Sequence, residues 1–147
     1  MHISPAAPST AIELFFRTFE TNASSNDTAA QVAHFADVFM AASPQGAQAV
    51  RVEDFARVLP RKKQLIDGLG CRSTILVSLE ETRLDARYVM AGSRWRMTFM
   101  RGHAVPQDVE VASVYIVDTG TDPFKIVFYL ASQDLMQVLR ERGISQN

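Results

Sequence analysis

The sequence contains little cysteine, no long apolar run and no excess of either charge. Its single cysteine, Cys71, excludes an internal disulfide and is typical of a reducing compartment. No apolar stretch approaches the roughly eighteen residues that a membrane span requires. The first residues lack the basic segment and the apolar core of a signal peptide. We therefore expect a cytoplasmic protein without a membrane partner.

Two further classes of function are disfavoured by what is missing. The 15 basic and 16 acidic residues give a net charge of −1, so the chain as a whole has no attraction for nucleic acid. His2, His34 and His103 lie far apart in the sequence and form no HxH or HxxxH pair. We therefore expect no nucleic-acid partner, no metal site and no cofactor.

The second half of the sequence contains the alternation of apolar and polar residues that is typical of β-strands. Trp95, Met97 and Phe99 alternate with polar residues inside a predicted long strand over 86–101, and this period indicates an antiparallel strand buried on one face. Similar patterns predict further strands over 73–82, 108–118 and 124–131, with a short edge strand over 47–52.

The long strand changes parity along its length. Tyr88 and Met90 are even-numbered, whereas the apolar residues from Trp95 onward are odd-numbered. A one-residue bulge at Gly92-Ser93 would keep both halves facing the same core, and glycine suits such a position. We therefore predict a bulge there.

Helical periodicity fills the first half of the chain. Apolar residues at helical spacing predict a first helix over 10–22, with the stripe Ile12, Phe15, Phe16 and Phe19. Asn26 or Asp27 is placed to cap a second helix. That helix is predicted from a repeat of the stripe at Val32, Phe35, Ala36 and Phe39.

The remaining segments complete the predicted order of elements. Pro60 separates two short predicted helices, 53–59 and 60–69, and a last helix is predicted over 132–142. The charged run Arg61-Lys62-Lys63 is interpreted as a solvated helix face. Residues 1–9 are predicted to be a flexible tail before one domain over 10–147. Helices followed by strands indicate an α+β fold, with the helices on one face of a curved, mostly antiparallel sheet.

Three local features in this order resemble the nuclear transport factor 2-like superfamily, which includes the SnoaL-like and ketosteroid isomerase families. They are the segment Phe35-Ala36-Asp37…Ser43-Pro44-Gln45-Gly46, the strand with Trp95, and the final hairpin with its Gly120 turn. The resemblance implies a sheet curled into a cone, with the first helix across its mouth and a pocket between them. It also implies a homodimer formed through the sheet.

The catalytic residues of ketosteroid isomerase do not carry over to this chain. The resemblance places a general-base aspartate where this sequence has Ser43, and a serine hydroxyl without a base does not shuttle protons at neutral pH. A tyrosine is expected on the first helix, which offers only phenylalanines. The resemblance also implies a carboxylic acid on the penultimate strand, where this sequence has Ser113 or Val114 instead. We therefore do not expect isomerase chemistry in that form.

The favoured hypothesis is a small-molecule-binding SnoaL-like domain for a hydrophobic or weakly polar organic ligand. The predicted ligand-binding residues share inward parity or the pocket position of the resemblance: Phe19, Ser43, Trp95, Ser113, Tyr115 and Tyr129. An interior filled by side chains is an equally open interpretation of the same aromatic residues.

Two alternatives remain open from the sequence. One is an isomerase, cyclase or dehydratase acting on a cyclic or polyketide-like substrate. It would use Tyr115, or His34 and Asp37, which are three residues apart on the predicted second helix. The other is a non-catalytic dimerisation or protein-interaction domain that uses the outer face of the sheet.

Overall fold

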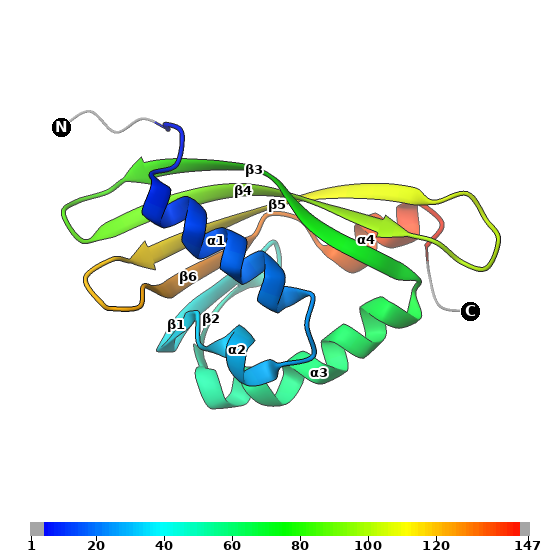
Figure 1. The fold of residues 1–147 in the computed structure, drawn as a ribbon. Helices are drawn as coiled ribbons and strands as arrows, with labels where there is room; N and C mark the ends of the chain where they lie inside the picture. Colours follow the sequence, from blue (N-terminus) through cyan, green and yellow to red (C-terminus); the bar gives the residue numbers. More distant parts are fainter. Residues whose placement is uncertain (1–4, 145–147) are drawn as a thin grey trace.

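The computed structural model describes residues 5–144 and shows helices on the concave face of a curved, unclosed sheet (Figure 1). The described helices are α1 (Thr10–Ala23), α2 (Thr28–Val32), α3 (Val52–Gly68) and α4 (Leu135–Glu141). The described strands are β1 (Phe35–Ser43), β2 (Gly46–Arg51), β3 (Cys71–Arg83), β4 (Tyr88–Phe99), β5 (Gln107–Asp118) and β6 (Lys125–Ala131). Their order in the sheet is β2-β1-β6-β5-β4-β3, antiparallel except between β1 and β6. The predicted α+β fold is confirmed.

Helix α1 begins and packs as its sequence predicts. The Ser9 hydroxyl accepts a hydrogen bond from the backbone N–H of Ile12 at 3.4 Å and so caps the first turn. Ile12 and Phe16 are fully buried, and Phe15 and Phe19 pack beside them. This apolar stripe holds α1 across the concave face of the sheet (Figure 1).

Strand β4 runs without the predicted bulge. Its pairing with β5 is unbroken from end to end. The small residues Ala91 and Ser93 are buried on the same face as Trp95, while Tyr88 and Met90 lie half exposed on the outer face. The bulge predicted beside Ser93 is therefore wrong, because small side chains occupy the inner positions and the apolar even-numbered residues face outward.

The predicted second helix is mostly a strand. Only Thr28–Val32 is helical, and Phe35–Ser43 forms β1 between β2 and β6. Phe35 and Phe39 are both buried, but positions i and i+4 share a face in a strand as they do in a helix. Their spacing therefore does not distinguish the two conformations, and pairing with two neighbouring strands decides the outcome.

One continuous helix replaces the two that Pro60 predicts. Helix α3 contains Pro60 in its interior, where a proline removes one backbone hydrogen bond and costs about 3 kcal/mol. Phe55, before the proline, and Ile66, after it, both pack inward. Burial on both sides of Pro60 favours an uninterrupted helix.

Residues 5–9 differ from the predicted flexible tail because they are held against β3. Ala6 and Glu81 exchange two backbone hydrogen bonds of 2.8 Å. The backbone N–H and the hydroxyl of Ser9 donate to the Glu81 carboxylate at 3.1 and 2.8 Å. These contacts cover part of an edge strand. The rest of the predicted tail, residues 1–4, lies outside the described residues.

The buried side chains form two clusters on the concave face. The larger one, beneath α1, includes Ile12, Phe16, Phe35, Phe39, Leu76, Val89, Trp95, Tyr115, Val117 and Ile126. The second joins α3 and α4 to the far end of the sheet and consists of Ile66, Leu69, Met97, Phe99, Val109, Leu139 and Ile144. Helix α4 begins after the cap Asp134, whereas the predicted last helix begins at residue 132.

Candidate functional site

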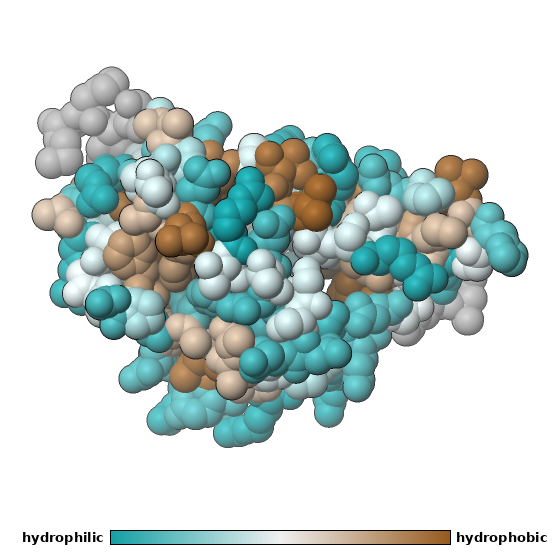
Figure 2. Space-filling model, viewed as in Figure 1, coloured by the Kyte–Doolittle hydropathy of each residue, from teal (hydrophilic) through white to brown (hydrophobic). Residues whose placement is uncertain are grey.

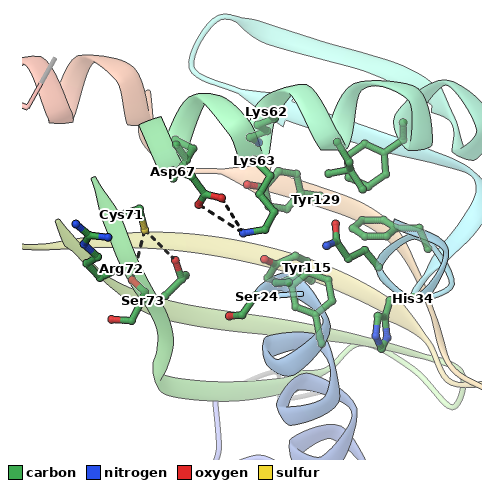
Figure 3. A pocket seen from close by; sticks show the side chains of 18 residues that line it. Ser24, His34, Lys62, Lys63, Asp67, Cys71, Arg72, Ser73, Tyr115 and Tyr129 are labelled. Carbon is green, nitrogen blue, oxygen red and sulfur yellow. Dashed lines mark hydrogen bonds and ion pairs between the residues drawn. The ribbon is translucent and has the colours of Figure 1, made fainter. Parts of the chain in front are cut away.

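A pocket opens on the concave side of the sheet where α1 ends. Its walls are the end of α1, helix α2, the inner face of α3 and the first residues of β3 (Figure 2). Side chains of β5 and β6 form its floor (Figure 3). The cavity volume is about 290 Å³. Because α1 ends at Ala23, no later turn of this helix fills the space.

Aromatic side chains form the floor and the inner walls of the pocket. The Phe19 ring lies 5.6 Å from the Tyr115 ring, and Tyr115 lies 5.2 Å from Tyr129, measured between ring centroids. Phe35 and Phe55, 4.9 Å apart, form a second aromatic wall. Aromatic surface with a few hydroxyl groups is typical of sites for small organic molecules.

Tyr115 lies deepest in this floor. Burial raises the pKa of the Tyr115 phenol well above its ordinary value, and the adjacent Tyr129 adds to the rise. Polar contacts with the side chains of Ser113 and Trp95 lower the pKa and only partly oppose it. The phenol is therefore protonated at neutral pH and is suited to hydrogen bonding rather than to acting as a base.

His34 forms part of the wall as a neutral ring. Its Nε2 lies 2.9 Å from the amide nitrogen of Asn22. An amide nitrogen only donates, so Nε2 accepts and the ring proton lies on Nδ1. The ring packs against Phe15 and Phe19 at 5.2 and 5.4 Å. Burial, and then the charge of Lys125, lowers the pKa of His34.

Charged side chains surround the mouth above the aromatic floor. The Lys63 ammonium lies 3.2 and 3.4 Å from the two carboxylate oxygens of Asp67, one turn later on α3. Lys62 and Arg72 also line the pocket (Figure 3). The pocket therefore has an aromatic floor and a mouth in which cations outnumber carboxylates.

The interpretation of Arg61-Lys62-Lys63 as a solvated helix face does not predict that Lys62 and Lys63 line a pocket. The spacing of the two lysines in the sequence nevertheless indicates it. Lys62 and Lys63 both lie three or four residues after Leu59, and both lie three or four residues before Ile66. In one continuous helix these positions share a face. Dividing the segment at Pro60 hides that relation.

Comparisons with known proteins identify the fold. No family model and no curated protein matches the sequence. An NTF2-like protein of unknown function from Shewanella oneidensis superposes with a TM-score of 0.67 at 13% identity, over 84% of this chain and 97% of its own. The β subunit of benzoate 1,2-dioxygenase from Burkholderia mallei superposes with a TM-score of 0.66 at 15% identity, over 88% and 93%. An NTF2-like protein with a cystatin-like fold from Novosphingobium aromaticivorans has a TM-score of 0.67 at 12% identity, over 93% and 88%. The chain has the nuclear transport factor 2-like fold.

In this nuclear transport factor 2-like fold, half of the predicted ligand-binding residues line the pocket: Phe19, Tyr115 and Tyr129. Trp95 is buried behind Phe19, with ring centroids 6.0 Å apart. Its indole N–H donates to the Ser93 hydroxyl at 3.0 Å, and that hydroxyl donates to the Ser113 carbonyl at 2.8 Å. Trp95 and Ser113 thus lie in the packed layer beside the pocket.

Ser43, at the end of β1, does not line the pocket. Its hydroxyl donates to the Gln45 side-chain oxygen at 3.1 Å and accepts from the Gln45 backbone N–H at 3.2 Å. It borders a second, open depression beside β2 and β6, which shares Lys62 and Tyr129 with the pocket. The position at which the resemblance implies a general base therefore holds a turn-forming serine.

His34 and Asp37 do not meet as the helical spacing predicts. His34 is buried just before β1, whereas Asp37 is exposed on that strand. Residues three apart in a strand lie on opposite faces. The prediction that these side chains meet is wrong because the segment is extended.

The described residues offer few other chemical groups. Among residues 5–144, no group of three or more His, Cys, Asp or Glu side chains is placed to hold a metal ion. Within the same range, no helix combines the length and the apolar character needed to cross a membrane. The Cys71 thiol, at the edge of the pocket, lies 3.6 Å from the Ser73 carbonyl and 3.7 Å from the Thr74 hydroxyl.

Proposed function

We propose that this chain is a small-molecule-binding domain whose pocket takes a small, largely apolar organic ligand. The observation that carries the proposal is the cavity of about 290 Å³ lined by five phenylalanine and tyrosine rings. Its volume lies just below the range of about 300–1,000 Å³ that is typical of ligand pockets. A ligand with one or two rings fits this space.

The chemistry of the lining supports binding rather than proton transfer. Tyr115 is held in its protonated form. His34 uses Nε2 to accept a hydrogen bond from Asn22. Ser43 occupies a turn outside the pocket. None of these groups is a free base facing the aromatic floor, so the enzymatic alternative receives less support than ligand binding.

A plug at the mouth tests the binding proposal. Ala23 is exposed and lines the pocket, so Ala23→Trp fills the mouth without entering the core. Thr21→Trp is the matched control, because Thr21 is exposed on α1 but does not line the pocket. Compounds found by thermal-shift screening of small aromatic molecules are expected to bind the wild type and Thr21→Trp. They are expected to bind Ala23→Trp at least about tenfold more weakly by calorimetry. Equal binding to all three proteins would place the site elsewhere.

A second proposal concerns the outer face of the sheet, through which we propose that the chain forms a homodimer. The described helices pack on the opposite face of the sheet. On the outer face, neighbouring strands bring together the apolar side chains of Met40, Val114, Ile116, Phe128 and Leu130. Such an uncovered apolar layer is typical of an interaction surface. Sedimentation velocity is expected to show a dimer for the wild type and a monomer for Ile116→Lys. A monomeric wild type at micromolar concentration would contradict this proposal.

A further inference from the structure

The mouth of the pocket has a charge opposite to that of the whole chain. The chain has a net charge of −1. Lys62, Lys63 and Arg72 nevertheless line this one cavity together with a single carboxylate, that of Asp67. These residues come from α3 and from the start of β3, the strand that follows it directly in the chain. The local excess of positive charge in this segment is therefore brought to the mouth of the cavity by the turn between α3 and β3.

The cations at the mouth differ in how far they are already neutralised. Lys63 is partly buried, with 28% of its side chain exposed, and it is paired with Asp67. Within residues 5–144, no carboxylate lies within 4.0 Å of the charged nitrogens of Lys62 or Arg72. The ammonium of Lys63 lies between α3 and the sheet, on the side of Tyr115 and Tyr129 (Figure 3). Positive charge is thus available where the aromatic floor meets the solvent.

The floor itself supplies no charge to a ligand. The phenol of Tyr115 and the imidazole of His34 are both neutral, and phenylalanine rings together with Leu59 and Ile66 supply apolar surface. A ligand that fits both parts therefore has an apolar ring body and one anionic group at its outer end. Near the low-dielectric floor, an attraction between unlike charges is stronger than it is in bulk water.

We propose that the ligand of this pocket is an organic anion, an aromatic or alicyclic acid whose rings lie on the Phe19–Tyr115–Tyr129 floor. Its charged group lies at the mouth beside Lys62, Lys63 and Arg72. This inference rests on the proposed binding function and adds the chemical class of the ligand. The Asp67 carboxylate weakens the binding of such an anion, because it competes with the ligand for the Lys63 ammonium.

Two nearly isosteric probes separate charge from shape. The probes are 2-naphthoate and 2-naphthamide, which share a ring system and differ in charge. Calorimetric titration of the full chain at low salt is expected to give about tenfold tighter binding of 2-naphthoate. The ratio is expected to shrink at high salt, because the mouth is open to solvent.

Substitutions at the mouth are expected to act in opposite directions. Lys63→Met is expected to weaken 2-naphthoate several-fold and to leave 2-naphthamide unchanged. Asp67→Asn is expected to tighten 2-naphthoate, because the competing carboxylate is gone. Arg61→Met is the matched control, since it removes the same charge from an exposed position of α3 that does not line the pocket.

The outcomes distinguish this inference from the binding proposal beneath it. If both probes bind wild type equally, or if Lys63→Met and Arg61→Met change 2-naphthoate binding alike, the anionic class is overturned and pocket binding stands. If neither probe binds at millimolar concentration, the binding proposal fails and this inference fails with it. A 2-naphthoate preference that Lys63→Met removes and Asp67→Asn increases supports the anionic class.

Discussion

Two neighbouring regions of the concave face, a packed half beneath α1 and a hollow half beyond its end, share strands of the sheet but differ in what covers them. Under the first turns of α1, Ile12 and Phe16 fill the space completely, and the inner residues Val89 and Val117 are fully buried. Beyond Phe19 the helix ends, and α3 covers the sheet from a distance. The end of α1 therefore separates the core cluster beneath this helix from the cavity, and the second core cluster lies beyond, under α3 and α4.

Phe19 marks the boundary between the packed half and the hollow half. Its ring lies 6.0 Å from both Phe16 and Trp95 in the packed half, and 5.6 Å from Tyr115 in the pocket floor. The packed half is almost entirely apolar, whereas the hollow half adds charged side chains at its mouth. Substitutions in the two halves are therefore expected to have different consequences.

The largest expected contrast is between two phenylalanines. Phe16→Ala removes a fully buried ring and is expected to lower the free energy of unfolding by about 3–5 kcal/mol. Phe55→Ala, at the pocket wall, is expected to cost about 1–2 kcal/mol, because part of that ring already faces open space. Urea unfolding followed by the fluorescence of Trp95 measures both. Similar losses in the two variants would mean that the halves are packed alike.

A smaller contrast concerns buried and exposed serines. Ser93→Ala removes the hydroxyl that accepts from the Trp95 indole, and the unpaired buried N–H is expected to cost about 1–3 kcal/mol. Ser73→Ala, at the exposed edge of the pocket, is expected to stay within about 0.5 kcal/mol of wild type. If Ser93→Ala left the free energy of unfolding unchanged, the packed half would tolerate an unpaired hydrogen-bond donor.

The smallest expected effect is a pH dependence at the boundary. Burial lowers the pKa of His34 in the folded state, so below about pH 6.5 the unfolded chain binds more protons at this residue than the folded one. Stability is therefore expected to fall as the pH drops through 6.5 toward the lowered pKa. His34→Gln is expected to flatten this dependence in unfolding titrations, with the exposed His103→Gln as control. If the free energy of unfolding of His34→Gln depended on pH as strongly as that of the wild type, His34 would not be the cause of the dependence.

Local patterns were sufficient to predict some elements. The stripe from Ile12 to Phe19 predicted α1, and the alternation around Trp95 predicted β4, because in each case one face is buried along the whole element. These patterns also brought Phe19, Tyr115 and Tyr129 together correctly. Short-range spacing is informative where burial follows a single period.

Elements that depend on distant partners were not predictable in this way. Strand β1 is held by β2 on one side and by β6 on the other, where Met40 pairs with Phe128, 88 residues later in the chain. Helix α3 continues through Pro60 because its two ends are buried in different clusters. The positions of Lys62 and Lys63 at the pocket follow from that continuity, so the charged mouth was hidden as well.

The central claim, that the sheet is packed in one half and able to bind in the other, is tested most directly by nuclear magnetic resonance. Backbone-amide shifts would be mapped while 2-naphthamide is added to the wild-type chain. The account predicts saturable shift changes at Phe19, Tyr115 and Tyr129, with none at Val89 and Val117. Changes centred on the outer face of the sheet, or no saturable change at any of these residues, would contradict it.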